Sequence, residues 1–119
     1  MQPINPFEDV KQFMEACGQT TNKENEHQAL LYVELITEEL RELQSAEFSV
    51  DALDAVMDTI WVLAGYAYSK GWKPACAWRE VARSNMDKVD PETGTVQKRP
   101  DGKVLKPKDW KGPQLQTCV

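Results

Sequence analysis

The sequence predicts an all-α protein, a four-helix bundle with a C-terminal hairpin or extended arm, and it predicts that the chain is oligomeric. Apolar residues recur at three- and four-residue spacing through about residues 6–86, the period of helices that bury one face. From about residue 87 to 119 proline, glycine and lysine become frequent, and the helical period stops. With 119 residues in all, the chain has the size of one domain.

The first helix is expected to begin at Pro6, because proline suits the first helical turn. Gly18 is expected to end it. A second helix is predicted from about Asn25 to Ala46, with its apolar stripe flanked by acidic residues.

The third helix is predicted from Ser49, as N-cap, to about Lys70, where Gly71 closes it. It is apolar on nearly all sides, so we expect it to lie centrally or in a subunit interface. A helix this apolar in a small chain favours a homo-oligomer.

Pro74 suits the start of a fourth helix that ends near Asn85. In the arm, the sequence RPDGK is a turn signal between the segments TVQK and KVLK, which alternate roughly in polarity. A small hairpin followed by an extended tail is therefore expected.

Charge is distributed unevenly along the chain. Residues 1–69 carry 13 acidic and 3 basic side chains, whereas residues 70–119 carry 6 acidic and 11 basic ones. The acidic half could gather metal cations and the basic half could meet an anion such as a phosphate chain; charge balance between helices is the plainer alternative. A pI near 4.9 argues against nucleic acid as a partner.

Neither a membrane nor a secretory route is predicted. No stretch approaches the roughly 20 apolar residues that span a bilayer, and the N-terminus lacks the pattern of a signal peptide. The three cysteines, Cys17, Cys76 and Cys118, have no CxxC spacing. Free thiols in a reducing cytoplasm are therefore expected rather than a disulfide or a zinc site.

Two acidic pairs predict a metal site. Glu39 and Glu42 share one face of the second helix, and Asp54 and Asp58 stand four apart in the otherwise apolar third helix. Carboxylates in an apolar surface are costly unless a cation or hydrogen bonds compensate them. Four carboxylates suit two or more Mg²⁺ ions; a solvated acidic face and helix-bridging polar residues are the alternatives.

A di-iron site is excluded, because it needs two Glu-x-x-His motifs and the only histidine is His27. A basic set near the end of the fourth helix could hold a triphosphate, and Asn85 could supply an amide to a base or sugar. Solvated lysine is the alternative for any one member. The set comprises Arg83, Lys88, Lys103 and Lys106.

Several motifs together resemble the all-α nucleoside triphosphate pyrophosphohydrolases, the MazG-like and HisE-like superfamily. EELRE at 38–42 is similar to its EExxE signature, and DALDAVMDTIWVLAGYAYSKGW resembles its second metal-binding helix. RSNMDK at 83–88 and DGKVLK at 101–106 resemble the C-terminal signature of the phage-type branch. The likeness covers about residues 7–115. Many MazG members carry ExxD in the second helix, and Ala55 departs from that pattern.

The resemblance implies metal ligands at Glu39, Glu42 and Asp58, with Asp54 as the fourth, and Mg²⁺ or Mn²⁺ as cofactor. Glu38 matches the first glutamate of the motif and is the candidate that positions or deprotonates water. The family forms dimers, often dimers of dimers.

The predicted activity is metal-dependent hydrolysis of a nucleoside triphosphate to the monophosphate and pyrophosphate. Lys88, Lys103 and Arg83 are expected to neutralise the pyrophosphate, and Asn85 to contact the nucleotide. A role in nucleotide-pool control is favoured, with a purine deoxynucleotide in a viral context as substrate. Phosphoribosyl-ATP as substrate and a non-catalytic oligomerisation module are the alternatives.

Overall fold

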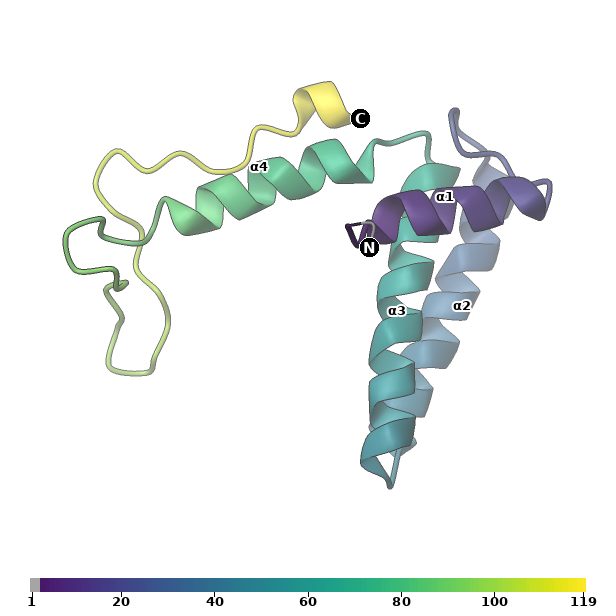
Figure 1. Cartoon of the computed structure of the whole chain (residues 1–119), viewed down its shortest axis with the longest axis horizontal. Helices are drawn as coiled ribbons and strands as arrows, with labels where there is room; N and C mark the ends of the chain where they lie inside the picture. The colour runs from purple at the N-terminus through teal and green to yellow at the C-terminus, as the bar shows by residue number, and fades with distance from the viewer. Residues whose placement is uncertain (1–2) are drawn as a thin grey trace. The chain divides into compact units, whose positions relative to one another are not determined.

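The computed structural model describes residues 3–119 and has four α-helices (Figure 1). They are α1 (Pro6–Ala16), α2 (Glu26–Ser45), α3 (Ser49–Ser69) and α4 (Pro74–Met86), followed by the short 3₁₀ helix η1 (Gln116–Cys118). Extended segments in the described part of the chain pair only through isolated bridges. The prediction of an all-α protein is therefore confirmed.

The chain divides into two compact units, one ending at Pro74 and the other spanning Ala75–Val119. The first holds α1, α2 and α3, and the second holds nearly all of α4 together with the C-terminal arm. Helix α4, which the sequence predicted as the fourth helix of the bundle, thus groups with the arm. A single domain over residues 1–119 stays a prediction.

Each helix of the first unit begins near its predicted start. Asn5 caps α1, because its side-chain oxygen accepts a hydrogen bond of 3.1 Å from the backbone N–H of Glu8. Asn25 caps α2 in the same way through Gln28, also at 3.1 Å. The expectation that Ser49 caps α3 is wrong: Ser49 is the first helical residue, and Phe48, in extended conformation, holds the cap position without a side-chain hydrogen bond.

Helices α2 and α3 form an antiparallel pair joined by a short turn (Figure 1). The pair packs closely because α3 has a glycine where Tyr32 of α2 lies. A Cβ atom at Gly65 would be 2.1 Å from Cε1 of Tyr32, far inside van der Waals contact. The core is completed by α1, and its buried members are Val10, Met14, Tyr32, Val62, Ala64 and Tyr68.

Polar contacts fix the end of this pair that lies away from the turn. The buried amide of Gln28 donates to the hydroxyl of Ser69 at 2.8 Å, and that hydroxyl donates to the carbonyl of Gly65 at 2.8 Å. Lys70 forms ion pairs with Glu24 and Glu26. The acidic end of the pair, near the turn, has no comparable set of ion pairs among the described residues.

In the second unit the predicted hairpin is present as a short antiparallel pairing. The N–H of Leu105 donates to the carbonyl of Gln97 at 2.7 Å, and the N–H of Arg99 donates to the carbonyl of Lys103 at 2.8 Å. Gly102 adopts a φ of 91° in the turn between the two paired segments, a conformation that glycine adopts readily because it has no Cβ atom.

The tail is not simply extended, because a disulfide joins Cys76 of α4 to Cys118 of η1, with the Cα atoms 5.6 Å apart. The expectation of free thiols is therefore wrong for these two cysteines and holds for Cys17, which is free and exposed. The two cysteines stand 42 residues apart in sequence. Only the return of the tail along α4 brings them together.

Within residues 3–119, no helix is both long enough and apolar enough to cross a membrane. Cytoplasmic location remains a prediction.

Candidate active site

The predicted acidic residues lie on the two paired helices and influence one another. The pKa of Glu39 on α2 is raised, first by desolvation and then by the proximity and charge of the Glu42 carboxylate. The charges of Asp58 and Asp54, from α3, raise it further. The four residues predicted as metal ligands therefore form one electrostatic cluster across the α2–α3 pair.

Glu39 is the most enclosed side chain of the cluster on α2. The residue is half-buried, and its Oε2 atom is shielded from solvent without any hydrogen-bond partner. A buried carboxylate oxygen ordinarily has a donor or a cation beside it. Asp58 is half-buried as well, whereas Glu42 and Asp54 are exposed.

An open cavity of about 360 Å³ adjoins the cluster at the turn between α2 and α3. Glu42 and Asp54 line it, and so do two carboxylates that the sequence reasoning did not single out, Glu47 and Asp51. Asp51 lies one helical turn before Asp54, and this i, i+3 spacing was the signal that could have found it. The acidic surface is thus wider than the four predicted ligands.

The donor set fits a hard divalent cation, since carboxylate oxygens are the ligands that Mg²⁺ and Mn²⁺ prefer. The orphaned oxygen of Glu39 is the observation that favours such a cation. In their present rotamers, no three or more acidic, histidine or cysteine side chains of residues 3–119 converge tightly enough to enclose an ion. Side-chain rotation would therefore have to accompany binding.

Glu38, the predicted water-positioning residue, is exposed on α2 beside Glu39. Glu34, one turn earlier, is exposed too. His27 is likewise an exposed helix residue.

In the C-terminal unit, the positive charge of Arg83 is already paired. Its guanidinium contacts Glu80 at 3.1 Å and Asp87 at 2.8 Å, and it donates to the carbonyl of Gly112 at 3.1 Å. Arg83 therefore fastens the arm to α4, a role that the sequence did not suggest.

Lys88 and Asn85, two predicted substrate-binding residues, lie together at the end of α4. The Lys88 ammonium donates to Oδ1 of Asn85 at 3.1 Å and lies 5.0 Å from the ring centroid of Trp110. Lys106 approaches the same ring at 5.1 Å. Lys103 is exposed in the hairpin turn, and among the described residues no side-chain contact links it to Arg83, Asn85 or Lys88.

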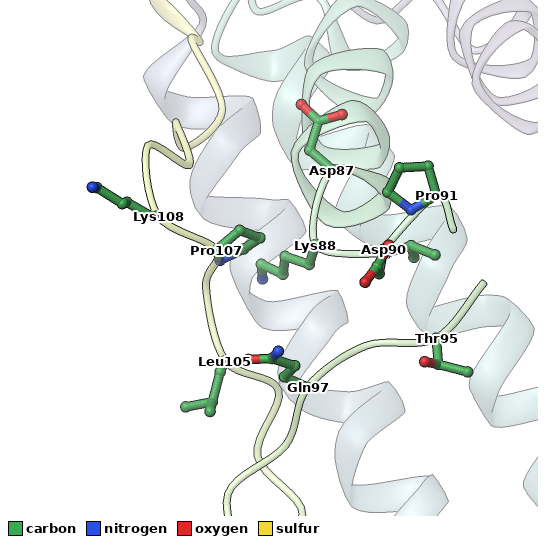
Figure 2. A pocket seen from close by; sticks show the side chains of 10 residues that line it. Asp87, Lys88, Asp90, Pro91, Thr95, Gln97, Leu105, Pro107 and Lys108 are labelled. Carbon is green, nitrogen blue, oxygen red and sulfur yellow. The ribbon is translucent and has the colours of Figure 1, made fainter. Parts of the chain in front are cut away.

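A second cavity, of about 340 Å³, lies between the end of α4 and the hairpin (Figure 2). The figure shows the side chain of Lys88 extending toward Pro107, with Gln97 and Leu105 at the hairpin side. Its lining mixes apolar residues with charged and polar ones, among them Lys88 and Gln97.

Comparison with known proteins assigns the helical part of the chain to a family. Residues 10–85 match the family described as phosphoribosyl-ATP pyrophosphohydrolase. The chain belongs to the phosphoribosyl-ATP pyrophosphohydrolase family. This family is part of the MazG-like all-α nucleoside triphosphate pyrophosphohydrolase superfamily. No curated protein matches the chain.

The matched range contains every acidic residue of the cluster, together with Arg83 and Asn85, but ends before Lys88 and Lys103. Membership indicates a pyrophosphohydrolase that acts on a nucleotide. The family is named after phosphoribosyl-ATP, the substrate given above as the alternative to a deoxynucleoside triphosphate. Assignment to the phage-type branch stays a prediction.

Proposed function

We propose that the chain hydrolyses a nucleoside triphosphate between its α and β phosphates, in a metal-dependent reaction that releases the monophosphate and pyrophosphate. The observation that carries the proposal is the uncompensated cluster around Glu39. The charges of Glu42, Asp54 and Asp58 all act on Glu39. No ion pair in the described part of the chain joins any of these four carboxylates to lysine or arginine. Such an arrangement is unfavourable without a cation.

In this proposal Glu39, Glu42, Asp54 and Asp58 hold two or more Mg²⁺ or Mn²⁺ ions. When bound, these ions lower the pKa of coordinated water and polarise the phosphoryl group. Glu38 accepts a proton from the attacking water or orients it, since it lies next to the ligands and remains exposed.

The substrate-binding roles belong to the C-terminal unit. Lys88 and Lys103 contact phosphate oxygens and Asn85 contacts the base or sugar. Arg83 is the weakest of these candidates, because Glu80 and Asp87 already neutralise it. A lysine ammonium is a compact point charge that suits phosphate.

The likeness of the C-terminal motifs to the phage-type branch favours a purine deoxynucleoside triphosphate in a viral nucleotide pool as substrate. Phosphoribosyl-ATP is the alternative, and the family match favours it. Both substrates contain the same α–β phosphoanhydride, so the acidic cluster serves either one. The two substrates differ in the nucleoside: phosphoribosyl-ATP contains ribose in place of deoxyribose and carries an additional phosphoribosyl group on its adenine.

The protein is further proposed to be a homodimer or homotetramer. An apolar stripe on α3 faces solvent, with exposed fractions of 79% for Val50, 61% for Leu53, 51% for Met57 and 46% for Ile60. Their spacing of three and four residues places them on one helix face. A second stripe on α2 comprises Leu30, Val33 and Leu40. Exposed apolar faces of this extent mark interaction surfaces.

A nucleotide panel tests the proposed reaction. Purified protein with Mg²⁺ is incubated with the four deoxynucleoside triphosphates, ATP and phosphoribosyl-ATP, and the products are separated by anion exchange. We expect equal amounts of monophosphate and pyrophosphate from at least one substrate, and none with EDTA. Orthophosphate as the only product would contradict the proposal, and turnover of no substrate would favour the non-catalytic module.

A further inference from the structure

A third cavity, of about 600 Å³, lies in the C-terminal unit between α4 and the tail. Arg79, Glu80 and Arg83 line it from α4, and Lys111, Gln114 and Thr117 line it from the tail. Neither Arg79 nor Lys111 belongs to the set proposed for the reaction. Both are exposed.

The lining carries an excess of positive charge that its single carboxylate cannot neutralise. Both oxygens of Glu80 contact Arg83, at 3.1 and 3.2 Å, and one of them also accepts from the N–H of Gln114 at 2.9 Å. These contacts, led by Arg83, lower the pKa of Glu80. Glu80 is therefore fully engaged with Arg83 and the tail.

Arg79 and Lys111 are left as the two unneutralised cations of the cavity. Neither side chain forms an ion pair or a hydrogen bond with any described residue. One comes from α4 and the other from the tail, so they approach the same space from its two walls.

The two walls are fixed to each other at several points. The Cys76–Cys118 disulfide closes one end, with Cys76 itself in the lining. Arg83 donates to Gly112 at 3.1 Å, and the indole N–H of Trp110 donates to the carbonyl of Ser84 at 2.7 Å. A cavity held in this way need not be reorganised when a ligand enters, which lowers the free-energy cost of binding.

We propose that this cavity binds a small anion of the phosphate class, with Arg79 and Lys111 as its direct partners and the disulfide holding the tail wall in place. Guanidinium and ammonium groups form charge-assisted hydrogen bonds with phosphate oxygens, and Thr117 adds a hydroxyl. The proposal does not rest on the acidic cluster or on the reaction assigned to it. It holds equally if the chain has another substrate.

Calorimetric titration of the full, oxidised chain with pyrophosphate in EDTA tests the proposal. We expect saturable binding. Each of the single variants Arg79→Gln and Lys111→Gln should weaken it about tenfold, the loss typical of one charge-assisted hydrogen bond. Lys98→Gln removes an exposed lysine of the same arm outside the cavity. It is the matched control and should change the affinity less than twofold.

Two further measurements define the ligand and the role of the disulfide. A nucleoside triphosphate that loses affinity in the same two variants would show that the phosphate chain of a nucleotide is the bound group, whereas binding of pyrophosphate alone would identify a free anion. Reduction of Cys76–Cys118 should weaken binding, because the disulfide holds the tail wall against α4. Absence of pyrophosphate binding, or equal weakening by Lys98→Gln, would overturn the proposal.

Discussion

At the scale of single residues, Glu39 joins the sequence pattern to the proposed chemistry. The charges of three other carboxylates act on it, and one of its oxygens has no hydrogen-bond partner. Its raised pKa means that the folded state disfavours the charged form. Negative charge at this position therefore costs stability unless a cation balances it.

Glu39→Gln is consequently expected to stabilise the metal-free protein near pH 7 and to reduce the additional stabilisation by Mg²⁺. Thermal unfolding with EDTA and with Mg²⁺ measures both effects. Glu34→Gln, an exposed position on the same helix, is the matched control and should change neither. A destabilised metal-free Glu39→Gln protein would contradict the account of the cluster.

The pH dependence of this difference has a fixed sign. A raised folded-state pKa gives a contribution to stability that is present at low pH and is lost as the pH rises through that pKa. The stability of the metal-free wild-type protein should therefore approach that of Glu39→Gln as the pH falls and Glu39 takes up its proton. Urea unfolding of both proteins from pH 7 to pH 4 measures the gap, and a gap that widens on acidification would be inconsistent with the shift.

Gly65 controls how closely α2 and α3 approach. Alanine at a helix position usually stabilises by about 0.5–1 kcal/mol over glycine, but a Cβ here would lie 2.1 Å from the Tyr32 ring. Overpacking typically costs about 1–3 kcal/mol, so Gly65→Ala should be destabilising overall in urea unfolding. Adding Tyr32→Leu should recover part of the loss through relief of the clash, and strictly additive effects would argue against the contact.

The identities of the clustered carboxylates could be predicted because i, i+3 and i, i+4 spacings place residues on one helix face. The unpartnered oxygen of Glu39 could not be predicted, because its burial depends on how closely α2 packs against α3. Asp51 and Glu47 were missed since their position beside the cluster follows from the geometry of the turn.

At the scale of elements, the helix bounds followed from caps and breakers that act locally. Asn25 and Gly71 lie at the ends where they were expected, whereas Ser49 is one residue inside α3. The Cys76–Cys118 bond was missed because sequence spacing carries no information about a tail that returns along α4.

The solvent-facing stripe of α3 provides a test at this scale. Leu53→Lys should shift the protein toward the monomer, because a buried lysine in an apolar interface is costly unless it is paired. Met86→Lys, with an exposed fraction of 66% on α4, is the control and should leave the oligomer intact. Sedimentation velocity measures both, and a wild-type protein that is monomeric at micromolar concentration would refute the proposed assembly.

At the scale of the whole molecule, the chain separates a predominantly acidic unit from a predominantly basic one. The family match spans the first unit and most of α4, so the acidic helices are the part that family membership describes. The C-terminal unit carries two cavities of its own, one lined by residues beyond 85 and one lined by both α4 and the tail. Their functions rest on the contacts described above.

The central claim is that the carboxylates of α2 and α3 form a metal-dependent pyrophosphohydrolase site, and Asp58→Asn tests it most directly. Asparagine keeps the shape of the side chain and removes the charge. Because changes even in the surroundings of metal ligands cost about 10–100-fold in activity, the loss of a ligand should lower pyrophosphate release with Mg²⁺ by about 100-fold or more. Circular dichroism should show an unchanged helical content.

Asp9→Asn, a matched change at an exposed position on α1, should retain full activity. The decisive measurement is the rate of pyrophosphate release by Asp58→Asn relative to the wild-type protein, with the best substrate of the nucleotide panel. A loss of two orders of magnitude in a folded protein is the predicted result. Activity within a few-fold of wild type would contradict the assignment of the site.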